Sequence, residues 1–78
     1  MSGKVELFGT KACPFTRELR EQLLWDRRAF VEYDVDDDAE ARRRMLELTS
    51  GSRTVPVLVE NDRVVQVGWQ GRGCTVGP

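Results

Sequence analysis

Residues 11–16 read Lys-Ala-Cys-Pro-Phe-Thr, and they place a thiol between a short apolar run and a long amphipathic pattern. The apolar run, residues 5–9, is typical of a short buried strand. From residue 14 to about residue 28, apolar side chains recur at helical spacing behind a proline that suits a first helical position. The stretch therefore predicts a strand, a loop and a helix, with Cys13 where the helix begins.

A thiol at a helix start lies in an unusual electrostatic environment. The free amides of the first turn and the positive end of the helix dipole both favour the thiolate. Lys11 and Arg17 lie close by in the sequence and act in the same direction. Because the thiolate is the attacking form in disulfide exchange, Cys13 is the candidate catalytic nucleophile.

The overall composition excludes several classes of partner. The chain has 78 residues, enough for one domain, and 12 basic residues against 13 acidic ones. A net charge of −1 offers no electrostatic footprint for nucleic acid or an anionic membrane. No run approaches the roughly 20 apolar residues of a membrane span, and no signal peptide is evident. We expect a cytoplasmic protein with neither nucleic acid nor membrane as a partner.

The inventory of metal-binding and nucleophilic side chains is small. The chain has two cysteines, Cys13 and Cys74, and no histidine. Two cysteines alone do not complete a tetrahedral zinc site, and a nucleophile activated by imidazole is excluded. A structural disulfide between them is possible in principle, although cytosolic glutathione normally keeps such pairs reduced. We expect no metal site.

The rest of the chain alternates between strand and helix patterns. The patterns predict a strand at residues 29–35 and a helix at residues 39–49. They then predict two strands, residues 56–60 and 63–67, joined by a tight turn at Asn61-Asp62. Residues 68–78 are predicted to be a glycine-rich loop or tail. The order is β-α-β-α-β-β, an α/β fold. A right-handed crossover makes the two early strands parallel, and the late hairpin completes a four-stranded mixed sheet with two helices.

Two motifs in this order resemble a known family. Cys13-Pro14-Phe15-Thr16 follows the first strand, and Arg53-Thr54-Val55-Pro56 leads into the third. Together they resemble the glutaredoxin branch of the thioredoxin-like superfamily, in a single-cysteine C-x-x-T form. The resemblance implies a glutaredoxin-like domain over residues 1–70 that lacks the usual terminal helix, and a glycine-rich C-terminal tail, residues 71–78, that carries Cys74.

The resemblance also implies a substrate site. It makes Pro56 cis, so that the Val55 backbone faces an extended thiol peptide. The substrate-binding residues that it implies are Lys11, Phe15, Arg53, Thr54, Val55, Pro56, Gly68 and Trp69. Two of them have a plainer interpretation: Phe15 as a core residue, and Arg53 as a solvated loop charge.

Thr16 stands where the family pattern often has a second cysteine. Its hydroxyl can hydrogen-bond the Cys13 thiolate, but it cannot resolve a mixed disulfide. Resolution must therefore come from glutathione or from Cys74. The glycine-rich arm allows Cys74 either role, as a resolving thiol or as a bystander.

The resemblance implies a thiol-disulfide oxidoreductase. Its co-substrate would be glutathione or another low-molecular-weight thiol, its substrates disulfides or glutathionylated proteins, and no bound cofactor is expected. We expect a monomer or a weak homodimer. Two alternatives stay open: a glutathione-dependent iron–sulfur cluster carrier, and a redox-inactive interaction module with a thioredoxin fold.

Overall fold

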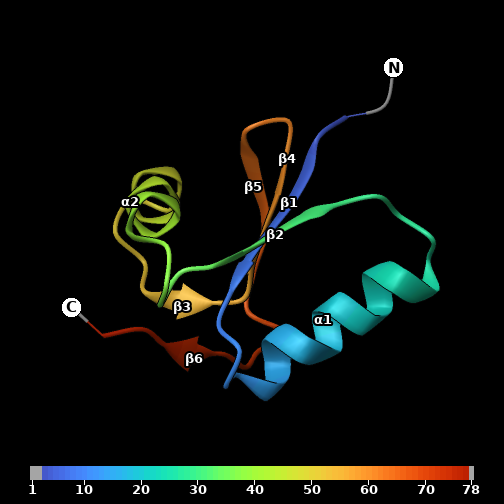
Figure 1. Ribbon diagram of the computed structural model, residues 1–78, viewed down its shortest axis with the longest axis horizontal. Coiled ribbons are helices and arrows are strands. Elements are labelled where there is room, and N and C mark those ends of the chain that lie inside the picture. The colour runs from blue at the N-terminus through green and yellow to red at the C-terminus, as the bar shows by residue number, and fades with distance from the viewer. Residues whose placement is uncertain (1–2, 78) are drawn as a thin grey trace.

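The computed structural model describes residues 3–77. In chain order the elements are β1 (Val5–Gly9), α1 (Pro14–Trp25), β2 (Val31–Asp34), α2 (Ala39–Leu48), β3 (Thr54–Val55), β4 (Val57–Glu60), β5 (Arg63–Val67) and β6 (Cys74–Thr75), as Figure 1 shows. Residues 1, 2 and 78, at the ends of the expected domain and tail, lie outside the described residues.

The main sheet has the predicted mixed topology. Its four strands lie in the order β2-β1-β4-β5. β1 and β2 run parallel, whereas β4 is antiparallel to both β1 and β5. Asn61 and Asp62, with φ of 54° and 64°, form the tight turn of the β4–β5 hairpin. The sheet and its two helices confirm the expected α/β fold.

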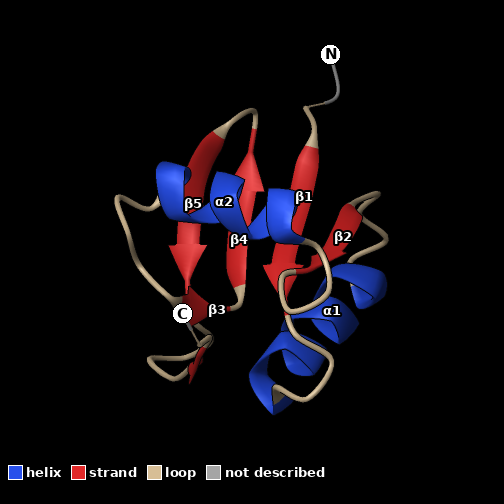
Figure 2. Cartoon of the chain, turned by 60° about the vertical axis from the view of Figure 1, so that its left-hand side comes forward, coloured by secondary structure: helices blue, strands red, loops and turns tan. Residues whose placement is uncertain are grey.

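The two helices cover opposite faces of this sheet (Figures 1 and 2). On the α2 side the buried cluster contains Phe8, Cys13, Val35, Ala41, Met45, Val55, Val57, Val59 and Val76. On the α1 side it contains Val5, Leu7, Leu19, Leu23 and Leu58. Residues 3–77 hold no third helix, and Val65 and Val67 of β5 remain exposed. Neither described helix is long and apolar enough to cross a membrane.

The first helix is shorter than its apolar pattern suggested. The Asp26 amide bonds back to the Gln22 carbonyl oxygen at 2.9 Å, and Arg27 takes a left-handed conformation with φ of 57°. A left-handed residue cannot continue a right-handed helix, so α1 ends at Trp25 rather than near Arg28.

The prediction of a loop or tail after β5 is wrong at Cys74–Thr75. These residues form β6, which pairs antiparallel with β3 in a separate two-stranded sheet. The chain reverses at Gln70 and Gly71, whose φ angles are 52° and 77°. Trp69 and Arg72 exchange both backbone hydrogen bonds across this reversal, at 2.6 and 2.9 Å. A tight turn has therefore formed where glycine content alone suggested flexibility.

A buried carboxylate links β1 to α2. The Glu6 side chain is fully buried, and it accepts hydrogen bonds from the guanidinium of Arg44 and, at 3.0 Å, from the Tyr33 hydroxyl. Arg44 also bonds Asp62 in the β4–β5 turn at 2.7 Å. The hydrogen bonds from Arg44 hold the pKa of Glu6 below its ordinary value, against the opposing effect of burial.

We expect Glu6→Gln to lower the free energy of unfolding at pH 7 by about 1–3 kcal/mol, because a charge-assisted hydrogen-bond pair is lost. The folded-state pKa of Glu6 lies below its unfolded value. The stabilisation is therefore present above about pH 4.5 and is lost as the pH falls through the folded pKa. Urea denaturation at pH 7 and at pH 3 measures this difference. The exposed Glu18→Gln is the control, and an equal Glu6→Gln deficit at both pH values would contradict the prediction.

Candidate redox-active site

The loop after β1 positions Cys13 as the N-cap of α1. The Cys13 amide donates to the Thr10 carbonyl oxygen at 3.3 Å, and the Cys13 carbonyl accepts from the Arg17 amide at 3.3 Å. Pro14 follows at the first helical position, and the first turn carries no acidic residue. Cys13 is only 2% exposed. The sequence expectation of a thiol at a helix start is therefore confirmed, with the sulfur well shielded from solvent.

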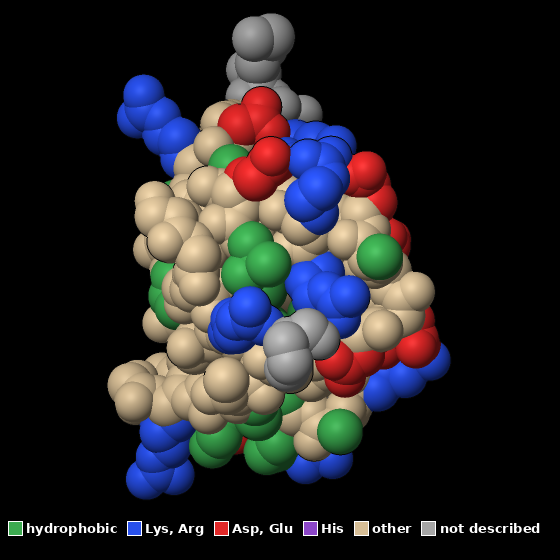
Figure 3. Space-filling view, turned by 90° about the vertical axis from the view of Figure 1, so that its left-hand side faces the viewer, with side chains coloured by type: hydrophobic (Ala, Val, Ile, Leu, Met, Phe, Trp, Pro, Cys, Tyr) green, Lys and Arg blue, Asp and Glu red, His purple; other side chains and the backbone are tan. Residues whose placement is uncertain are grey.

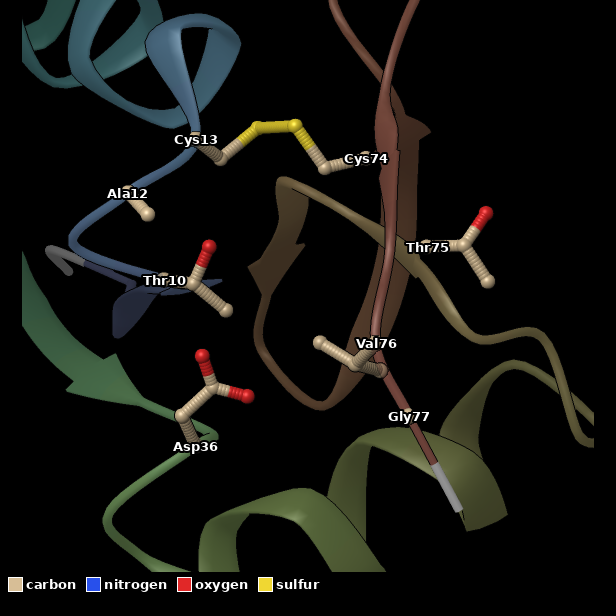
Figure 4. A pocket seen from close by; sticks show the side chains of 8 residues that line it. All are labelled: Thr10, Ala12, Cys13, Asp36, Cys74, Thr75, Val76 and Gly77. Carbon is tan, nitrogen blue, oxygen red and sulfur yellow. A yellow bond between two sulfur atoms is a disulfide. The ribbon is translucent and has the colours of Figure 1, made fainter.

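Cys13 forms a disulfide with Cys74, as Figure 4 shows. The Cα atoms lie 6.0 Å apart, within the range that a disulfide spans. Cys74 comes from β6 and is partly buried. Sequence reasoning left open whether this thiol reaches Cys13 or remains a bystander. The structure brings the two cysteines together.

Two glycines allow the C-terminal segment to return this closely. A Cβ at Gly68 would lie 2.6 Å from the Arg72 carbonyl oxygen, and Gly68 itself has φ of +84°. The Gly68 amide donates to the Pro56 carbonyl oxygen at 2.7 Å, which fixes the start of the return on the loop that carries Pro56. A Cβ at Gly73 would lie 2.8 Å from the Val55 carbonyl oxygen. Side chains at either position would push the turn away from β3.

Strand β3 presents its backbone directly to β6. In the antiparallel register Val55 lies opposite Cys74 and Thr54 opposite Thr75. The Cys13 Sγ atom lies 4.0 Å from the Val55 carbonyl oxygen. The Val55–Pro56 peptide bond is cis, as the family resemblance implied. The backbone expected to face a thiol peptide thus faces this chain's own cysteine.

A pocket of about 280 Å³ opens beside the disulfide (Figure 4). Its lining consists of Thr10, Ala12, Cys13, Asp36, Cys74, Thr75, Val76 and Gly77. Sequence reasoning did not assign Thr10 or Asp36 to the site. Each follows one of the two parallel strands, and the carboxyl ends of parallel strands lie at one edge of a sheet. Their positions in the sequence could therefore have predicted that they lie near each other at the site.

The two residues that follow Pro14, Phe15 and Thr16, differ in burial. Thr16 is fully buried, and its hydroxyl lies 3.5 Å from the Thr10 amide, from which it accepts. A Cβ at Gly9 would meet Thr16 at 2.2 Å, so the threonine packs tightly under β1. Phe15 is partly buried and packs against the cluster that includes Cys13, and its role in substrate binding stays a prediction.

The two basic residues expected at the substrate site are both engaged by other groups. The Lys11 ammonium lies 3.5 Å from the Asp37 carboxylate, and both side chains are largely exposed. The Arg53 guanidinium donates to the Gly77 carbonyl oxygen at 3.1 Å. On the face that carries the C-terminal segment, basic and acidic side chains are interspersed (Figure 3).

Gly68 and Trp69 are consecutive in the chain but contact different parts of the molecule. Gly68 contacts the loop at Pro56, whereas Trp69 packs against the cluster on the α1 side of the sheet. There it lies beside Trp25 and Glu18. The structure thus brings Gly68, but not the Trp69 ring, to the disulfide region.

The geometry suits disulfide exchange. A disulfide of this kind can be opened to a dithiol by exchange, and Cys13 lies at the N-terminus of α1, where the helix dipole favours a thiolate over a thiol. Within residues 3–77 there is no group of three or more potential metal ligands among histidine, cysteine and carboxylate side chains.

Comparison with known proteins identifies a family for the chain. The Glutaredoxin family model matches residues 5–65. A probable glutaredoxin of Synechocystis sp. is 36% identical over 63 residues, which cover 81% of this chain and 58% of that protein. A second probable glutaredoxin of the same organism is 34% identical over 65 residues, covering 81% of this chain and 72% of that protein. The matched region is thus less than two thirds of the first relative's length.

Solved structures share the fold. The crystal structure of the thioredoxin-like protein BC3987 is 34% identical with a TM-score of 0.77, and the match covers 86% of this chain and 89% of that one. Glutaredoxin 1 from Francisella tularensis is 23% identical with a TM-score of 0.65, over 87% and 85% of the two chains, and supports the fold alone. The family match includes Cys13 and the cis-proline loop, so this chain belongs to the glutaredoxin family.

Proposed function

We propose that the protein is a thiol-disulfide oxidoreductase that uses Cys13 as nucleophile and Cys74 as resolving thiol. The observation that carries the proposal is the Cys13–Cys74 disulfide at the start of α1. Membership of the glutaredoxin family supports thiol oxidoreductase chemistry in general. Cys74 supplies the second thiol, which Thr16 cannot provide.

The catalytic cycle has four exchange steps. The Cys13 thiolate attacks one sulfur of a substrate disulfide, forms a mixed disulfide and releases the other substrate sulfur as a thiolate, which takes up a proton. The Cys74 thiolate then attacks Cys13 Sγ, which forms the Cys13–Cys74 bond and releases the second substrate thiol. Two equivalents of a low-molecular-weight thiol reduce this bond by the same exchange chemistry and leave as their own disulfide.

Glutathione is the co-substrate that we propose for the last step, with disulfide or glutathionylated proteins as substrates. In the cytoplasm, the compartment that we propose, the glutathione pool supplies these reducing equivalents. Lys11 and Arg53 are both exposed and are the candidates that we propose for the glutathione carboxylates, and each would exchange its present partner for the ligand. We propose that the protein acts as a monomer or a weak homodimer.

The experiment traps the intermediate. We expect Cys74→Ser, reduced and then exposed to oxidised glutathione, to accumulate one glutathione on Cys13, because the resolving thiol is absent. The wild-type protein treated identically would instead reach the intramolecular disulfide, two hydrogen masses below the reduced form. Intact-protein mass spectrometry after acid quenching distinguishes these products. A persistent glutathione adduct on the wild-type protein would argue against a resolving role for Cys74.

A further inference from the structure

Strand β6 lies where a substrate strand would lie. We propose that residues 73–77 occupy, within the same molecule, a docking site for an extended polypeptide. The external occupants would be strands in which glycine precedes the reacting cysteine and a branched aliphatic residue follows two positions later. This inference rests on the proposed function, because it concerns the substrates of the same nucleophile.

The first observation is the pairing of β3. Within residues 3–77 the only strand that pairs with Thr54–Val55 is β6. The disulfide fixes the register, since a cysteine bonded to Cys13 lies opposite Val55. An external strand that forms a mixed disulfide with Cys13 and pairs with β3 would place its cysteine in the same position. The two strands therefore compete for one edge.

The second observation concerns the residue before the cysteine. A Cβ at Gly73 would lie 2.6 Å from Thr54 Cγ2 and 2.8 Å from the Val55 carbonyl oxygen. The oxygen belongs to the strand that provides the pairing, and the methyl group belongs to a stiff β-branched side chain. The carbonyl oxygen cannot withdraw without disturbing β3, and the methyl group can withdraw only if Thr54 changes its rotamer. The site thus selects glycine at this position.

The third observation concerns the residues after the cysteine. Thr75 is exposed, so its position places little demand on the side chain. Val76 is only 5% exposed and packs into the cluster that contains Cys13, while its amide donates to the Arg53 carbonyl oxygen at 2.8 Å. A branched aliphatic side chain fills this position, whereas a charged one would be buried without a partner.

Competition for one edge couples product release to resolution. When the Cys74 thiolate attacks Cys13 Sγ, the sulfur of the bound strand leaves as a thiolate and the Cys13–Cys74 bond forms. At the same time β6 takes the place of the departing strand beside Val55. Reduction of the Cys13–Cys74 bond by the thiol co-substrate frees the edge for the next strand.

The test measures mixed-disulfide formation on reduced Cys74→Ser. Three peptides, each carrying 5-thio-2-nitrobenzoate on its cysteine, have the sequences Arg-Gly-Cys-Thr-Val-Gly, the same with alanine before cysteine, and the same with aspartate in place of valine. Release of the yellow thiolate reports attack by Cys13. We expect each altered peptide to react about tenfold more slowly than the parent. The 2-mercaptoethanol derivative gives the reference rate.

A second variant tests the competition directly. Cys74→Ser combined with Val76→Asp should loosen the tail, so that the parent peptide accelerates more than the mercaptoethanol derivative does. Equal rates for the three peptides, with the mercaptoethanol derivative still consumed, would overturn this inference and leave the proposed function standing. If Cys74→Ser released no more of the yellow thiolate than a Cys13→Ser, Cys74→Ser control from any compound, the proposed function itself would fail.

Discussion

Cys13→Ser is expected to reduce a disulfide substrate no faster than buffer and glutathione do alone. A serine hydroxyl at the start of α1 stays protonated at neutral pH, so the helix terminus no longer produces a nucleophile. The loss is expected to be on the order of a thousandfold or more, as for other enzymes that lose their nucleophile. A glutathione-coupled assay with a small disulfide measures it.

The control for this result is Cys74→Ser. We expect it to keep a substantial rate at high glutathione concentration, because glutathione replaces Cys74 as the resolving thiol. In a single turnover without glutathione it should release one substrate thiol and stop at the mixed disulfide, whereas the wild-type protein should release both, because Cys74 attacks the mixed disulfide within the same molecule. Appreciable activity in Cys13→Ser would refute the assignment of Cys13 as nucleophile.

Reduction of the disulfide is expected to lower the free energy of unfolding by about 4 kcal/mol. The bond joins residues separated by 61 positions and restricts the unfolded chain accordingly. The core of a 78-residue domain supplies only roughly 3–5 kcal/mol without such a bond, so the disulfide about doubles the stability of a protein that stays folded when reduced. The midpoint of thermal unfolding should fall by on the order of 20 °C.

Guanidinium denaturation of the oxidised and reduced proteins measures this difference. Cys74→Ser should match the reduced wild-type protein in stability, and addition of a reductant should leave its midpoint unchanged. Equal denaturation midpoints for the oxidised and reduced wild-type proteins would show that the disulfide does not stabilise the folded protein.

Most of the main sheet could be predicted from local sequence. Residues 5–9 form β1 as expected, and the Asn61-Asp62 turn joins β4 to β5 as expected. Pro14 predicted the start of α1, because proline fits the first position of a helix and disrupts interior positions. These features depend on neighbours in the chain, which is why the sequence reveals them.

The parts that sequence reasoning missed depend on distant contacts. Strand β6 has only two residues, and its pairing with β3 joins positions about 20 apart in the chain. The reversal before it places Gln70, a residue without a special turn preference, in the left-handed region. No local pattern distinguishes such a segment from a flexible tail.

The candidate site shows the same division. The position of Cys13 followed from its own neighbours in the sequence, whereas its bond to Cys74 required the path of the whole C-terminal segment. The Thr16 hydroxyl accepts from the Thr10 amide beside Gly9, and its hydrogen bond to a free Cys13 thiolate stays a prediction, because Cys13 is bonded to Cys74 here.

Val76 gives the disulfide-bonded protein a further property. Its side chain is buried among the core residues on the α2 side, but it belongs to a segment that only β6 pairing, a few hydrogen bonds and one covalent bond hold in place. When the segment lifts, a valine and the apolar hollow beneath it both meet water. The exposed apolar surface area would then depend on the redox state. The reduced protein would expose more of it and would associate more readily with other apolar surfaces.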